Sequence, residues 1–94
     1  MREPDVALVR CPDYDSAAVL TAVRRAVNLL GGMGRFVQPG QRVLIKPNLL
    51  LPSEPERAIV THPTVVRAAV LLVQEAGGRV VIGDNPGVST IHYA

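Results

Sequence analysis

Polar residues follow two apolar segments of this chain, at the points where each segment is predicted to end as a strand. Lys46 and Asn48 come directly after Val43–Ile45, and Asp84 follows the segment 79–83. Open α/β sheets build ligand sites at the carboxyl ends of their strands. There an ammonium group would neutralise a carboxylate or phosphate, an amide would orient it, and a carboxylate would hold a cation or a hydroxyl. We therefore predict a binding site that contains Lys46, Asn48 and Asp84.

Each of these residues also has an ordinary structural explanation. Lys46, the only lysine in the chain, could lie along the rim of the sheet with its ammonium group in water. Asp84 begins the run Asp84-Asn85-Pro86-Gly87, and such residues bond to nearby backbone in turns. For Asn48 the functional interpretation is favoured, because a polar residue at this position costs stability unless it is used.

Thr61-His62-Pro63 is predicted to open a helix, since proline suits the first helical position. His62 then occupies the N-cap, where histidine is not a favoured residue. We rank capping first, and a second task for the imidazole, as a general acid–base or metal ligand, behind it. The unpaired N–H groups of this helix start suit an anion in either case.

Other ligand classes find little support in the sequence. A zinc or hard-cation site built from His, Asp and Asn has no supporting ligand spacing. The turn after the first apolar segment contains no glycine, and no Gly-Lys-Ser/Thr loop occurs, which disfavours NAD or ATP binding by the familiar routes. Cys11 is the only cysteine and is expected to be a small buried hydrophobe.

Composition narrows the class of protein further. The chain has 94 residues, of which 48% are hydrophobic and 3% aromatic, and its net charge is +2. One small domain over residues 1–94 is the most that this length allows. Scattered arginines and few aromatic residues argue against nucleic-acid binding. No apolar run is long enough to cross a membrane and no secretory pattern is present, so we expect a cytoplasmic protein without membrane contact.

The predicted elements alternate between strands and helices. Glycine pairs end both helices, and Asp15 or Ser16 caps the first. The predicted elements are a strand at 6–9, an amphipathic helix from about 16 to 30, a strand at 42–46, a mostly buried helix at 63–76 and a strand at 79–83. This βαβαβ order predicts an α/β fold of the three-layer type, with a parallel sheet and right-handed crossovers. The last seven residues give no clear signal.

One face of this predicted sheet lacks a cover. The second and third strands are apolar at successive residues, which is typical of strands covered on both faces. Two right-handed crossovers place both helices on the same face. We therefore expect either self-association, a partner chain over the sheet, or a chain that forms only part of a larger domain.

Several of these motifs together resemble the family called domain of unknown function 362. They are Gly31-Gly32, Val43–Asn48 with Lys46-Pro47-Asn48, Thr61-His62-Pro63, and Gly83–Gly87. Their order is similar to the amino-terminal region of that family. The resemblance implies that Lys46, Asn48, Thr61, His62 and Asp84 belong to a family pattern without assigned roles. Many members carry a ferredoxin-type segment further on, so an iron–sulfur cluster is expected only if a downstream segment exists, and no cofactor is expected within this chain.

Two functional hypotheses follow. In the first, the chain binds a small anionic ligand or metal at the strand ends, within a redox-associated enzyme family by analogy. Lys46 would neutralise charge, Asn48 would orient the ligand, His62 would transfer a proton and Asp84 would hold a cation or hydroxyl. In the second, the chain is a non-catalytic assembly module whose apolar sheet face docks a partner. The class of reaction stays unassigned.

Overall fold

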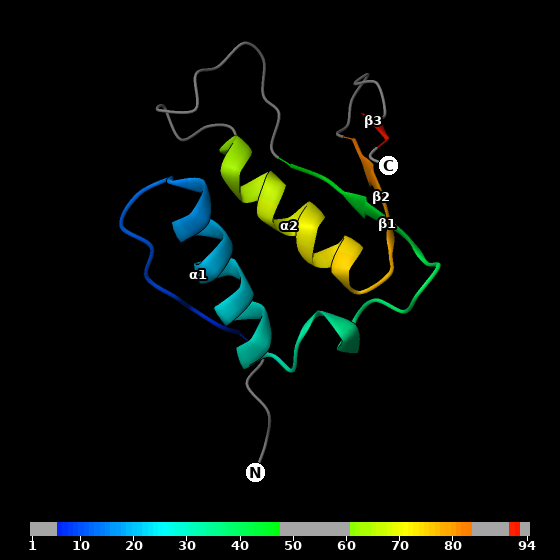
Figure 1. The fold of residues 1–94 in the computed structure, drawn as a ribbon, viewed down its shortest axis with the longest axis horizontal. Coiled ribbons are helices and arrows are strands. Elements are labelled where there is room, and N and C mark those ends of the chain that lie inside the picture. Colours follow the sequence, from blue (N-terminus) through cyan, green and yellow to red (C-terminus); the bar gives the residue numbers. More distant parts are fainter. Residues whose placement is uncertain (1–5, 48–60, 84–90, 93–94) are drawn as a thin grey trace.

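Two helices and a small sheet make up the computed structural model, which describes residues 6–47, 61–83 and 91–92. Figure 1 shows their arrangement. The elements in chain order are α1 (Ser16–Leu29), the short 3₁₀ helix η1 (Met33–Arg35), β1 (Arg42–Ile45), α2 (Pro63–Glu75), β2 (Arg79–Ile82) and β3 (Ile91–His92).

Both helices begin and end where the sequence predicts. Asp15 caps α1, because its side chain accepts a hydrogen bond from the Ala18 N–H at 3.0 Å. The chain leaves α1 through Gly31 and Gly32, with φ of 108° and 88°. Such angles disfavour residues with a Cβ atom, which is why glycine ends the helix. His62 caps α2, and Pro63 takes its first turn.

The two strands at whose ends the site is predicted, β1 and β2, are parallel. Strands β1 and β2 pair in parallel, with Leu44 opposite Val81. Strand β3 joins the other edge of β2 in the antiparallel direction, which gives the order β1-β2-β3. The chain therefore has an α/β fold with a parallel strand pair, as predicted.

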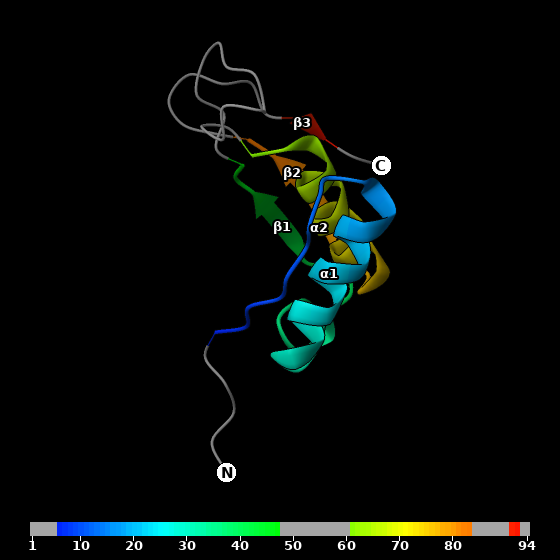
Figure 2. The same cartoon turned by 90° about the vertical axis from the view of Figure 1, so that its left-hand side faces the viewer.

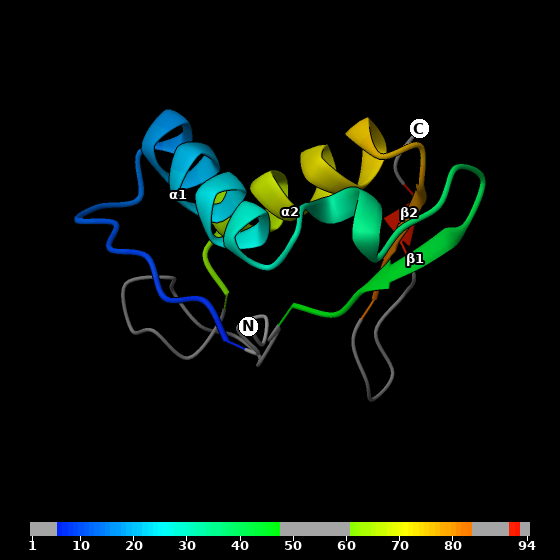
Figure 3. The same cartoon turned by 90° about the horizontal axis from the view of Figure 1, so that it is seen from below.

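The core lies between α2 and the sheet. Its buried residues are Val37, Val70, Val73, Val80 and Ile82, with Val43 and Ile45 partly buried against them. Helix α1 packs against α2, and both helices lie on the same side of the sheet (Figures 2 and 3).

Within the described residues, no element covers the opposite face of the sheet, as predicted. Burial alternates along β1, so that Val43 and Ile45 are half-buried while Arg42 and Leu44 are exposed. Leu44 exposes 56% of its surface. Side chains alternate between the two faces of a strand, so Leu44 projects away from α2.

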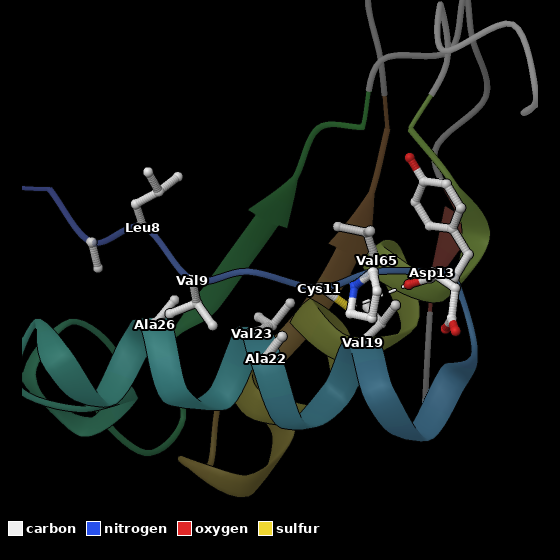
Figure 4. Close-up of a pocket in the computed structure, with 12 residues that line it drawn as sticks. Leu8, Val9, Cys11, Asp13, Val19, Ala22, Val23, Ala26 and Val65 are labelled. Carbon is white, nitrogen blue, oxygen red and sulfur yellow. Dashed lines mark hydrogen bonds between the residues drawn. The ribbon is translucent and has the colours of Figure 1, made fainter.

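The prediction of a first strand at Val6–Val9 is wrong. Residues 6–15 contain no strand, and the described sheet consists of β1, β2 and β3 only. The segment instead lies along α1, with Val9 pointing at the helix and Leu8 pointing away (Figure 4). A short apolar run has the composition of a strand, but it becomes one only when a neighbouring strand supplies hydrogen bonds. Strand β3, by contrast, arises in a region that had no clear signal.

An ion pair ties the two helices together. Arg24 on α1 donates hydrogen bonds of 2.6 and 2.9 Å to the carboxylate of Glu75 at the end of α2. These bonds lower the pKa of Glu75 below its usual value, and the same bonds raise the pKa of Arg24. Because the carboxyl pKa is lowered in the folded chain, the pair stabilises the fold above the usual carboxyl pKa and is lost as the pH falls through the lowered one. Both groups are exposed, so the effect is small.

Candidate functional site at the carboxyl edge of the sheet

Parallel pairing brings the ends of β1 and β2 to one edge of the sheet. The pairing continues past the strands, because the Gly83 N–H donates to the carbonyl of Ile45 at 3.1 Å. Helix α2 begins beside the carboxyl end of β1 in each view of the fold (Figures 1 and 3). Lys46, Thr61 and His62 therefore lie at the same end of the molecule, as the topology predicts. Asn48 and Asp84 lie outside the described residues.

His62 is held in place by the start of α2. Its Nδ1 accepts a hydrogen bond from the Thr64 N–H at 3.2 Å and lies 3.0 Å from the Thr64 hydroxyl. An Nδ1 that accepts must be unprotonated, so a neutral ring carries its proton on Nε2 and presents Nε2–H as a donor. The predicted capping role of His62 is confirmed, and the contact also fixes which ring nitrogen can serve a ligand.

Tyr14 adds a second ring to this place. The rings of Tyr14 and His62 are stacked, with centroids 4.1 Å apart and planes within 3°. Tyr14 comes from the loop before α1, far from His62 in the sequence, and we did not predict its involvement. The stack joins the first turn of α2 to the loop before α1, and it restrains the plane of the imidazole.

The loop that carries Tyr14 is shaped by two acidic residues. Asp13 accepts a hydrogen bond from the Asp15 N–H at 2.9 Å, and Asp15 caps α1. The thiol of Cys11 donates to the carbonyl oxygen of Asp13 at 3.2 Å. Cys11 is only partly buried, so the expectation of a buried cysteine is wrong. These contacts assign both acids to the local structure of the loop.

A cavity of about 500 Å³ lies between this loop and α1 (Figure 4). Its walls are mainly apolar, and the residues that form them are Val9, Cys11, Val19, Ala22, Val23, Ala26 and Val65, among others. In the described parts of the chain, no three His, Cys, Asp or Glu side chains come together as they would to hold a metal ion.

Lys46 shares the edge with His62 but not the face. The alternation of β1 continues beyond the strand, since Lys46 is exposed and Pro47 is buried. This places Lys46 on the same face as Leu44, the face that is turned away from α2. To contact a ligand bound at the start of α2, Lys46 must extend its long side chain around the end of β1.

Replacing His62 tests the cap. His62→Ala removes the acceptor of the Thr64 N–H and the stacked ring, and we expect it to lower the free energy of unfolding by about 1–2 kcal/mol. His62→Asn retains a capping oxygen and should lose less than about 1 kcal/mol. Urea unfolding followed by circular dichroism measures both. Equal losses for the two variants would mean that the capping bond contributes nothing.

Comparison with known proteins adds two matches. The family described as "Domain of unknown function (DUF362)" matches residues 43–94. The thylakoid-associated protein sll1697 of Synechocystis sp. is 49% identical over 81 residues, which cover 86% of this chain and 25% of that protein. The chain thus spans about a quarter of the length of this curated relative. No solved structure matches the chain.

Proposed function

We propose that this chain, which belongs to the DUF362 family, binds a small anionic ligand at the carboxyl edge of its sheet. A phosphate or carboxylate group is the chemistry that this edge suits best. The observation that carries the proposal is the parallel pairing of β1 with β2, which sets Lys46 and the start of α2 at one end of the fold.

The charges at this edge support an anion. The start of α2 carries the partial positive charge of the helix dipole. Its first N–H groups are already engaged, because Pro63 has no N–H and the Thr64 N–H donates to His62 Nδ1. The Val65 N–H donates to the His62 carbonyl, so the expectation of unpaired N–H groups at this helix start is wrong. His62 contributes Nε2–H as a donor, because Nδ1 is engaged by Thr64. Lys46 would neutralise the ligand from the neighbouring strand end. Asn48 and Asp84 remain in the proposal as the groups that orient the ligand and hold a hydroxyl or cation.

A redox-associated enzyme is part of this proposal by analogy with the family. This chain, however, does not fit an iron–sulfur cluster by itself, because such clusters are held by several thiolates and Cys11 is its only cysteine. Any cluster would need ligands from elsewhere, and no step of the proposed binding depends on one.

A second function is supported by a different observation, the 56% exposure of Leu44 on the uncovered face of the sheet. We propose that this face docks a polypeptide, either a second copy of this chain or a partner. A cytoplasmic location fits both proposals. In the described parts of the chain, no helix has the length and apolar character to cross a membrane. The Synechocystis relative is named as thylakoid-associated, and attachment through a docked partner is one way in which this chain would share that property.

Lys46→Met tests the anion site. We expect the affinity for inorganic phosphate to fall about tenfold, which corresponds to ~1.4 kcal/mol, because the cation proposed to neutralise the ligand is lost while the apolar stem is kept. Isothermal titration at constant ionic strength measures this. Arg25→Met, at an exposed position on α1, removes the same charge elsewhere and should leave the affinity unchanged. If both variants bind phosphate like the parent chain, Lys46 is not a ligand.

A further inference from the structure

The uncovered face of the sheet has a definite chemical pattern. Parallel partners lie side by side on the same face, so the register places Leu44 beside Val81 and Arg42 beside Arg79. Lys46 continues the same face beyond β1, as the alternation of burial shows. The face is therefore an apolar centre, Leu44 and Val81, between a pair of arginines at one end and a lysine at the other.

The charges on this face lack opposite charges in the described parts of the chain. Arg42 and Arg79 are adjacent like charges, an arrangement that destabilises a strand pair. The described carboxylates are engaged elsewhere. Asp13 accepts from the Asp15 N–H and Asp15 accepts from the Ala18 N–H in the first turn of α1, while Glu75 pairs with Arg24. A partner with carboxylates at both ends of an apolar stripe would remove the repulsion and cover Leu44.

We infer that this face binds an amphipathic helix of a partner polypeptide, in which leucine-type residues are flanked by aspartate or glutamate. Helices are the elements that normally cover the second face of a parallel sheet. From Arg42 to Lys46 the strand spans roughly 13 Å, at about 3.3 Å per residue. Carboxylates about two helical turns apart, ~11 Å, reach both ends through long side chains. The inference rests on the docking function proposed above. It shares Lys46 with the proposed anion site, and its test therefore substitutes Leu44 and Arg79, which belong to the docking face alone.

A membrane surface fits the same face less well. Proteins that lie on a bilayer usually insert aromatic or bulky apolar side chains between the headgroups. The exposed aromatic residues of the described chain, Tyr14 and Phe36, lie before α1 and after η1, and neither belongs to this face. Leu44 and Val81 are set in a sheet that is suited to the flat contact of a helix.

Two synthetic peptides test the inference with the full chain. One is a labelled helical peptide with a leucine stripe flanked by glutamate, and the other has glutamine in place of each glutamate. Fluorescence anisotropy should show that the acidic peptide binds at least about tenfold more tightly, and that added salt weakens it. Leu44→Ser and Arg79→Gln should each weaken binding about fivefold or more. Arg67→Gln, at an exposed position of α2, should leave it unchanged.

Other outcomes overturn the inference and separate it from the docking function. Equal binding of both peptides, or binding that Leu44→Ser leaves intact in a chain that circular dichroism shows to be folded, would exclude it. Val81→Thr is the substitute should Leu44→Ser unfold. If the chain binds neither peptide but self-associates, and Leu44→Ser abolishes the self-association, the docking function stands and the occupant of the face is a second copy of the chain. Binding to phosphatidylglycerol vesicles but not to peptides would assign the face to a membrane. If the chain binds neither peptides nor vesicles and does not self-associate, the docking function itself is excluded.

Discussion

Gly78→Ala is expected to lower the free energy of unfolding by about 1–3 kcal/mol, because the position between α2 and β2 has no room for a methyl group. A Cβ atom at residue 78 would lie 2.7 Å from Cγ1 of Val73 and 2.8 Å from Cγ1 of Val37. Both valines belong to the buried core, where close packing leaves them no free space to move into. Chemical denaturation with urea gives the free energy directly.

A shift of the backbone at Gly78 cannot relieve this clash without breaking a hydrogen bond. Its N–H donates to the carbonyl of Val73 at 3.0 Å, and the added Cβ would come within 3.2 Å of that same oxygen. Moving residue 78 away would break the bond that ends α2. A small domain has only a few kcal/mol of net stability, so the variant should be substantially unfolded at moderate urea concentrations.

Gly34→Ala is the matched control. A Cβ atom at residue 34 would meet no atom within 4 Å, so we expect a change of less than about 0.5 kcal/mol. Comparable losses at Gly34 and Gly78 would contradict the steric explanation, because the entropic effect of replacing glycine by alanine is to stabilise the fold by restricting the unfolded chain.

The elements with local signals were predictable. Asp15 and Pro63 mark helix starts whose capping groups are a few residues away, and Gly31 and Gly77 mark helix ends by their positive φ. The two parallel strands are close to the predicted 42–46 and 79–83, at Arg42–Ile45 and Arg79–Ile82. Such signals depend on neighbouring residues, so the sequence alone contains them.

The elements that depend on distant partners were not predictable. Val6–Val9 has the composition of a strand, but no described strand pairs with it. Strand β3 has only two residues, 91 and 92, and exists because β2 offers it an edge. Pairing is a property of the assembled sheet, and a short run does not reveal whether an edge is available.

The candidate site divides in the same way. Lys46 and His62 could be assigned to one edge, because parallel strands end together and α2 begins there. The stack of Tyr14 on His62 could not be inferred, since it joins the loop before α1 to the N-cap of α2 and no sequence spacing relates these two positions. The alternation of side chains along β1 could have assigned Lys46 to the face of Leu44. That assignment also requires knowing that only one face of the strand is covered.

Val80→Ala should be the second strongly destabilising change, with a loss of about 2–3 kcal/mol. Val80 exposes 2% of its surface and packs in the cluster between α2 and the sheet. Removing two buried carbon atoms costs roughly 0.8 kcal/mol for each, and the cavity left behind adds to this cost. Urea unfolding at low protein concentration measures the loss for the single chain.

Val81→Ala tests whether the loss at Val80 depends on the face of the sheet to which the side chain projects. Val81 follows Val80 in the same strand and is only partly buried, because its side chain projects to the uncovered side with Leu44. The same two carbon atoms are removed, so propensity and composition change equally and only the face differs. We expect a loss of less than about 1 kcal/mol at low protein concentration. If the loss approaches that of Val80→Ala, and grows with protein concentration, the face is already buried by association, because a bound partner adds its own free energy to folding.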